Sequence, residues 1–339
     1  MLIFIIALAA LLSIVLAIRH VQLHTGFMAV VMTLGILNFG VLELPKYHSI
    51  FNGLIYYVTF LLWVTFWFHI LVCIWKRTFI QKHTAASTNR FTIGTWVAGN
   101  SIMIVLTHHM FDSHHGWISF MAALNVGLWI AFIVMSIVTL GKGITEWRAT
   151  SLHGNLFLTT VSSQSVAIML LTIFPQTPIL LIVTIIMMGL IFYAISFLFI
   201  TSHFSFSNWN ATNCIFHGAL SISGVTLMLS GLWPMENLVM LWLVTLIVFI
   251  IIEAAEITVL VKQLTKENPF QVIFSSNISH WSRLFTFCMF FTFTHLLSFS
   301  SPLMRDASDN LLSALGAVIF ALLILELISI VFSYAQKRA

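Results

Sequence analysis

Six hydrogen-bonding side chains crowd the centre of one apolar stretch, residues 152–172. They are Thr159, Thr160, Ser162, Ser163, Gln164 and Ser165. The stretch is long enough to cross a bilayer, where no water is present, so these groups need partners within the protein. We therefore predict that this helix is buried in a bundle and lines a wet pathway. Within it we expect Thr160, Ser163 and Gln164 to contact the permeant species.

Three carboxylates lie inside other apolar stretches. Glu253 and Glu256 are three residues apart, and Glu326 lies near the end of the chain. Carboxylates within a membrane are costly and mark functional sites by default, and in a transporter that function is proton coupling. These stretches are otherwise uniformly apolar and belong on the outside of a bundle. The sequence therefore favours a structural or subunit-interface role, with proton coupling as the alternative.

The densest polar cluster is THHMFDSHH, residues 107–115. If the helix continues through it, His108, Asp112 and His115 share one face, and imidazole with carboxylate suits zinc or a similar divalent ion. A solvated histidine-rich turn is the competing interpretation. Further histidines lie within apolar stretches, where we expect packed, hydrogen-bonded side chains and where haem ligation is the alternative. These are His69, His217 and His295.

The composition is that of a polytopic membrane protein. Of 339 residues, 60% are hydrophobic and 7% charged, whereas soluble domains have about a quarter charged residues. We expect the lipid bilayer as a partner, and no nucleic acid, no enzymatic chemistry and no cofactor. Cys73, Cys214 and Cys288 show no paired spacing, so we predict packing residues and neither a disulfide framework nor a thiolate zinc site.

Eleven apolar stretches are long enough, or nearly long enough, to span a bilayer, which takes about 20 helical residues. They cover residues 1–18, 27–44, 53–75, 91–107, 117–140, 152–174, 178–201, 209–232, 238–261, 281–299 and 311–334. The first stretch lacks the basic start and the cleavage site of a signal peptide. We expect residues 1–24 to form an extra spanning helix, or else a helix that lies against the bundle, and residues 25–339 to form a ten-helix unit.

Basic residues predict the orientation. When the ten helices are threaded with both ends of the unit inside, twelve of the 14 Lys and Arg residues fall on the inner side. Only Lys46 and Arg305 fall outside. This bias predicts a cytoplasmic C-terminus, and we expect a multi-pass protein of the plasma membrane.

The ten helices alternate in character. Segments beginning at residues 27, 91, 152, 209 and 281 are rich in Gly, Ser, Thr, Asn and Gln, while each following segment is almost wholly aliphatic or aromatic. The repeat of about 60 residues suggests five hairpins. We predict an inner ring of five helices around a central pore, wrapped by an outer ring. Close packing through small residues is the plainer explanation of the same pattern.

Five pieces of sequence, one on each inner segment, match known patterns in order. They are GFMAVVMTLGIL (26–37), VAG (97–99), GNLFLTTVSSQSVAI (154–168), HGALSISG (217–224) and WSRLFTFCMF (281–290). Together they resemble the tellurite-resistance/dicarboxylate transporter family, to which the slow anion channel of plant guard cells also belongs. The resemblance covers the chain from about residue 26 to its end.

The resemblance implies an anion or dicarboxylate pathway within each subunit of a homotrimer. It implies a gate at Phe285. From the crowding of aromatic residues we add Phe287 as a second candidate, and we expect further pore positions on the inner segments at Gly35, Gly99, Asn100 and His217. Thr286 and Cys288 stand where the family pattern has Pro and Gly, so we expect the helix over residues 281–299 to be less kinked than in the family. Arg283 is a candidate to attract anions at the inner mouth, or an ordinary snorkelling arginine.

We expect membrane transport of a small anion, either a C4-dicarboxylate or an inorganic ion, through an aromatic constriction. Three alternatives remain open at this point. One is a divalent-metal transporter or sensor that uses the histidine cluster, and another is a haem or quinone membrane protein. The third is a scaffold that has kept the fold without transport.

Overall fold

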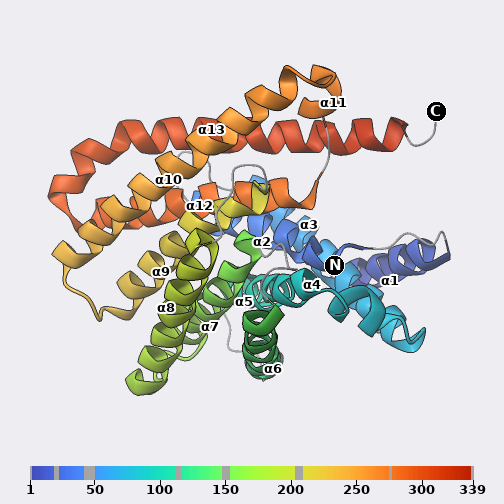
Figure 1. The fold of residues 1–339 in the computed structure, drawn as a ribbon. Coiled ribbons are helices and arrows are strands. Elements are labelled where there is room, and N and C mark those ends of the chain that lie inside the picture. The colour runs from blue at the N-terminus through green and yellow to red at the C-terminus, as the bar shows by residue number, and fades with distance from the viewer. Residues whose placement is uncertain are drawn as a thin grey trace.

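The computed structural model describes residues 2–18, 23–41, 50–111, 116–146, 153–202, 209–274 and 277–336. Every regular element in these ranges is helical (Figure 1). Seven of the described helices are long and apolar enough to cross a membrane. The protein is therefore a helical, membrane-embedded chain. That all ten predicted helices cross the membrane as five hairpins stays a prediction.

Five helices occupy the interior. They are α2 (Met28–Ile36), α5 (Gly94–Phe111), α7 (Leu158–Ile173), α9 (Ile215–Ser230) and α12 (Ile278–Ser300). Each packs against the next in this order, and α12 packs back against α2, so the five helices form a closed ring. Of the spans through α7 and α9, 83% of the residues are buried. These are the segments that the sequence marks as small and polar.

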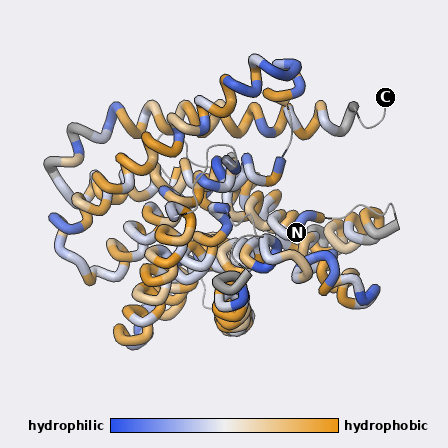
Figure 2. Tube along the Cα trace, viewed as in Figure 1, coloured by the Kyte–Doolittle hydropathy of each residue, from blue (hydrophilic) through white to orange (hydrophobic). Residues whose placement is uncertain are grey.

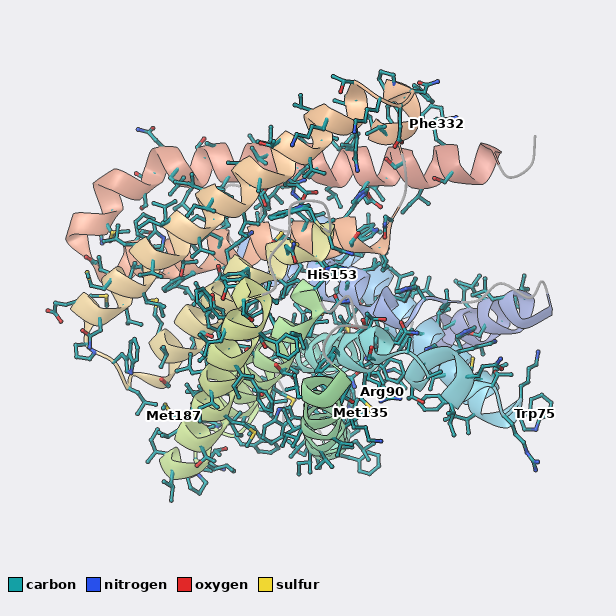
Figure 3. All side chains as sticks on the ribbon, viewed as in Figure 1. Trp75, Arg90, Met135, His153, Met187 and Phe332 are labelled. Carbon is teal, nitrogen blue, oxygen red and sulfur yellow. The ribbon has the colours of Figure 1, made fainter. Side chains whose placement is uncertain are left out.

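Five longer helices lie outside the ring. They are α3 (Ile50–Trp75), α6 (Gly116–Glu146), α8 (Ile179–Ser202), α10 (Met235–Leu264) and α13 (Pro302–Gln336). Only 22% of the span in α10 is buried, and hydrophobic residues follow one another along α6, α8 and α10 (Figure 2). Trp75, at the end of α3, is 83% exposed and points away from the bundle (Figure 3). An exposed apolar surface of this kind suits contact with lipid.

Helix α1 (Leu2–Ile18) packs against α3 at the edge of the molecule (Figure 1). The Ser13 hydroxyl bonds the Thr65 carbonyl oxygen at 3.1 Å, and Ala9 is fully buried at the contact. Helix α1 therefore lies outside the inner ring. Its crossing of the membrane stays a prediction.

Short helical turns lead into the inner helices. The 3₁₀ turns η1 (Thr25–Phe27), η4 (Gly154–Phe157) and η6 (Ala211–Cys214) directly precede α2, α7 and α9. The side chain of Asn210 accepts the Thr212 N–H at 3.0 Å, and Asn277 caps α12 in the same way. Asparagine is a preferred cap because its side-chain oxygen satisfies a backbone N–H that the helix leaves open.

Three short helices complete the described chain: η3 (Ile80–Thr84), a π-helical turn, α4 (Ser87–Thr92) and α11 (Pro269–Ile273). A second π-helical turn, η2 (Leu37–Val41), continues α2.

The turns η4 and η6 lie backbone against backbone, since a Cβ atom built on Gly154 would stand 2.0 Å from the Thr212 carbonyl oxygen. Only glycine permits this approach, which holds together the starts of α7 and α9.

We expect Gly154→Ala to destabilise the fold by about 1–3 kcal/mol, because the added methyl group meets backbone atoms that cannot rotate away. The matched control is Gly127→Ala on α6, where nothing lies within 4 Å of the added Cβ atom. The measurement is the thermal unfolding midpoint of each purified variant in detergent. Equal midpoints for the two variants would contradict the close backbone contact.

Candidate functional site

All five inner helices turn one face toward a common axis. A cavity of about 430 Å³ is lined by residues from each of them and from η2. The lining positions recur every three or four residues on each helix, as one helical face requires. They include Ile36 and Gly40, Ser101 and Val105, Ser165 and Ile168, Ile222 and Val225, and Met289 and Thr292. The ring is therefore hollow toward the C-terminal halves of its helices.

A second, much smaller cavity of about 10 Å³ lies among the N-terminal halves of the same five helices. Its walls come from the first turns of the helices or just beyond them: Ala29 and Met32, Thr95, Leu158, Ile215, and Ser282 and Phe285. Since the starts of all five helices meet here and their later turns meet at the large cavity, the five helices run in the same direction.

A short stretch of the five inner helices separates the two cavities. On α2 the lining passes from Met32 to Ile36, and on α12 from Phe285 to Met289. Four residues of helix rise about 6 Å. On α5, α7 and α9 the two linings are six or seven residues apart, about 9–11 Å, so one to two helical turns divide the cavities. Phe285 is 2% exposed and stands at this level. The residue that the resemblance names as a gate thus lies on the axis of the ring.

The large cavity is mostly apolar, and its few polar groups are already bonded. The hydroxyl of Ser165 bonds the Val161 carbonyl oxygen at 2.7 Å, and that of Thr292 bonds the Cys288 carbonyl oxygen at 2.8 Å. His295 adds an imidazole near the open end. Among the described residues that line the two axial cavities, none is a carboxylate.

The three expected contact residues of α7 face away from the axis. Thr160 Oγ1 bonds the Gly189 carbonyl oxygen of α8 at 3.0 Å, and Gln164 Nε2 bonds the Ile186 carbonyl oxygen at 3.2 Å. Ser163 accepts the Trp129 indole N–H of α6 at 3.1 Å. None of the three lines an axial cavity, and their contact with a permeant species stays a prediction. The helical phase puts Leu158, Ser165 and Ile168 on the axis instead.

Three other predicted pore positions serve helix packing. A Cβ atom on Gly35 would stand 2.2 Å from Ile102, and one on Gly99 would stand 2.7 Å from Met28, so both glycines bring α2 and α5 together. The side-chain oxygen Oδ1 of Asn100 accepts indole N–H bonds from Trp63 and Trp67 of α3 at 2.7 and 2.9 Å. None of the three predicted residues lines an axial cavity.

Phe287, the second aromatic candidate, also lies off the axis. Its ring meets Phe249 of α10 edge to face with centroids 4.9 Å apart, and the Arg283 guanidinium lies 5.9 Å from its centroid. Phe287 therefore packs between α12 and α10. Two positions on one helix, Phe285 and Phe287, have the same side chain and different surroundings.

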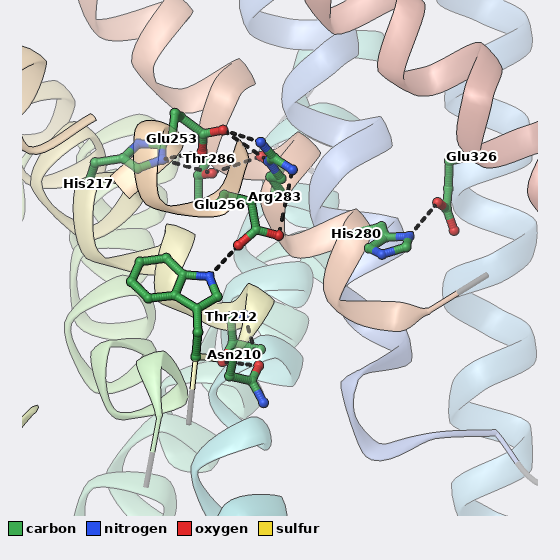
Figure 4. Close-up of polar contacts among 10 residues, drawn as sticks. Asn210, Thr212, His217, Glu253, Glu256, His280, Arg283, Thr286 and Glu326 are labelled. Atoms are coloured by element: carbon green, nitrogen blue, oxygen red, sulfur yellow. Dashed lines mark hydrogen bonds and ion pairs between the residues drawn. The ribbon is translucent and has the colours of Figure 1, made fainter. Parts of the chain in front are cut away.

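Two of the predicted carboxylates meet one arginine (Figure 4). Arg283 on α12 pairs closely with Glu253, its Nε lying 3.1 Å from Oε2, and its Nη1 lies 3.7 Å from Oε1 of Glu256. The Trp209 indole N–H donates to Glu256. His217, which is fully buried, lies 3.7 Å from the second oxygen of Glu253. Arg283 thus neutralises carboxylates of α10 and is not a free cation at a mouth.

The third carboxylate has its own partner. Glu326 of α13 lies 3.1 Å from Nδ1 of His280 on α12 (Figure 4). Both residues line a cavity of about 420 Å³ between α10, α12 and α13, which Arg283 and Glu256 also border. All three predicted carboxylates therefore join outer helices to α12, which agrees with the structural role favoured by the sequence.

The predicted metal set lies mostly outside the described residues. Asp112 and His115 belong to the part of the chain that the structure does not describe. His108 lies on α5, with its ring centroid 6.0 Å from that of His109. The grouping of His108, Asp112 and His115 stays a prediction.

Sequence reasoning missed the pairing of Arg283 with Glu253, which are 30 residues apart. The sequence does carry a signal for this pair, because a buried carboxylate on one helix requires a cation at the same depth on a neighbouring helix. It also missed Ser165 and Thr292 as axial hydroxyls, because the phase of a helix that is buried on all sides leaves no periodic signal.

Comparison with known proteins makes no assignment: no protein-family model matches this sequence, and no curated protein matches it significantly.

We expect Arg283→Ala to cost about 3 kcal/mol of stability, because it leaves two largely buried carboxylates without their cation. Adding Glu253→Gln should restore part of the loss, so the double variant costs less than the sum of the single ones. The measurement is a double-mutant cycle on thermal unfolding in detergent. Arg305→Ala, which alters an exposed arginine of α13, is the control and should change stability by no more than about 0.5 kcal/mol. Strict additivity at residues 253 and 283 would contradict the pairing.

Proposed function

We propose that this chain moves a small anion across the membrane through the axis of its five inner helices, with Phe285 as the constriction. The observation that carries the proposal is the meeting of five helix starts around the small axial cavity. Each helix N-terminus carries about half a positive charge from its aligned peptide dipoles. Five such ends around one point attract an anion without a lysine or arginine that would hold it too tightly.

The character of the walls supports an anion over a cation. No carboxylate lines either axial cavity among the described residues, whereas cation pathways use acidic rings or carbonyl oxygens. Arg283, Glu253 and Glu256 interact with one another where α12 meets α10, and none of the three lines an axial cavity. In this proposal the dipoles of the inner helices are the nearest source of positive potential to the axis.

The barrier between the cavities supports a closed state. Phe285 and Met32 line the small cavity, and an apolar constriction of this kind excludes water and ions. Rotation of the Phe285 ring away from the axis would join the two cavities. The outer helices, with their exposed aliphatic faces, contact lipid or other subunits of a homotrimer in this proposal.

We expect Phe285→Ala to raise anion flux about tenfold, which corresponds to lowering the barrier by about 1.4 kcal/mol. Phe287→Ala is the matched control, since it removes the same side chain two residues away, where it faces α10, and should leave flux within about twofold of the unaltered protein. The measurement is anion efflux from proteoliposomes loaded with chloride, nitrate, malate or succinate.

The same vesicles separate the rival mechanisms. A channel should conduct without a pH gradient, while a proton-coupled carrier should respond to one. Potassium flux should stay at the level of protein-free vesicles for every variant. Absence of flux for all four anions, together with no effect of Phe285→Ala, would overturn the proposal.

A further inference from the structure

A histidine, a cysteine and a second histidine meet in a buried cluster at the end of α3. His69 and Cys73 lie one turn apart on α3, and His83 comes from η3. One ligand atom of each residue lies within 4.8 Å of the others, and the three side chains are buried. The cluster is separate from the axis of the ring, since none of its members lines an axial cavity.

The distances suit a small tetrahedral ion. Zinc bonds to nitrogen at about 2.0 Å and to sulfur at about 2.3 Å, so neighbouring tetrahedral ligands stand about 3.3–3.6 Å apart. His69 Nε2 and Cys73 Sγ are 3.5 Å apart. The backbone N–H of Leu23 donates to His69 Nε2 at 3.4 Å, so this nitrogen is unprotonated, and a metal ion bound there would take over the lone pair that now accepts from Leu23.

The Thr25 hydroxyl can hold the second histidine in the tautomer that a metal needs. Thr25 Oγ1 lies 3.0 Å from Nδ1 of His83, and the Thr25 carbonyl oxygen in turn accepts the Trp96 indole N–H at 2.7 Å. When Nδ1–H donates to the Thr25 hydroxyl, Nε2 keeps its lone pair. Nε2 of His83 is buried and has no hydrogen-bond partner. A buried polar nitrogen without a partner calls for an explanation, and a bound ion is one.

Aromatic side chains pack against the second histidine. The rings of Phe79 and Trp96 lie 5.6 and 5.5 Å from that of His83. Neither ring gives its buried Nε2 a hydrogen-bond partner.

We propose that His69, Cys73 and His83 form a binding site for a zinc-like transition-metal ion. Two imidazoles and a thiolate select such an ion over magnesium or calcium, which prefer oxygen ligands. Three protein ligands leave one tetrahedral position for water or another ligand. The ion would clamp the end of α3 to η3, and through Thr25 to the start of α2.

The test uses the purified full-length chain in detergent, with Zn²⁺ and Co²⁺ as probes. We expect one Zn²⁺ per chain that depends on Cys73, and a cobalt–thiolate charge-transfer band when Co²⁺ replaces it. Cys73→Ser and His83→Gln keep side-chain volume and should weaken Zn²⁺ binding by about 100-fold or more, while Thr25→Val, which removes only the supporting hydroxyl, should weaken it about 10-fold. Mg²⁺ should not compete.

Matched controls separate the site from general damage. Cys288→Ala removes another buried thiol, and His153→Gln another histidine, and both should keep the cobalt band. Each variant is checked for a monodisperse elution profile, and Zn²⁺ should raise the unfolding midpoint of the unaltered chain but not of Cys73→Ser. A chain without a thiolate band, or a band that survives Cys73→Ser, would overturn the proposal.

Discussion

Every polar group inside this bundle must find its partner within the protein, and many hydroxyls of the inner helices find it on their own helix. Ser165, Thr226 and Thr292 each bond the carbonyl oxygen four residues earlier at 2.7–2.8 Å. A serine or threonine satisfied in this way behaves as a small side chain and does not require water. The inner helices therefore combine a polar composition with dry, close packing. Contacts such as Gly224 against the Phe293 ring bring them near enough to close a ring of five.

The same constraint acts more strongly on charge. An ionised carboxylate in a low-dielectric interior is tolerated only beside a cation and further donors. Arg283 supplies the cation for Glu253 and Glu256, and His280 bonds Glu326. Each of these links joins an outer helix to α12, so the charges help to fix how α10 and α13 sit on the ring. The axis is left to hydroxyls, apolar side chains and helix dipoles.

Composition and alternation were enough to predict an all-helical membrane protein and to name the five segments that the structure buries. Hydropathy carries that information because lipid-facing and protein-facing helices differ in average composition.

The direction in which each residue of a fully buried helix faces could not be predicted in this way. Residues 159–165 are buried on every side, so nothing in the sequence separates Thr160 and Gln164, which bond α8, from Ser165, which faces the cavity. The many hydroxyl groups suggested a water-filled pathway, but most of them are satisfied by hydrogen bonds to backbone carbonyl oxygens of their own helix. Two members of the proposed metal site could be paired from the sequence, because the i, i+4 spacing of His69 and Cys73 places them on one helical face. The third, His83, could not, because it reaches them only through the turn after α3.

The central claim is that five parallel helix faces surround one axial path, and thiol accessibility tests it most directly. Single cysteines at Ser165, Thr292 and Thr160, introduced into a cysteine-free chain in sealed vesicles, are exposed to a charged, membrane-impermeant thiol reagent. The structure predicts that cysteines at 165 and 292, which line the large axial cavity, react from one side of the membrane, and that a cysteine at 160, which faces α8, does not. A cysteine at 160 that reacts as fast as those at 165 and 292, or inert cysteines at both cavity positions, would contradict the account.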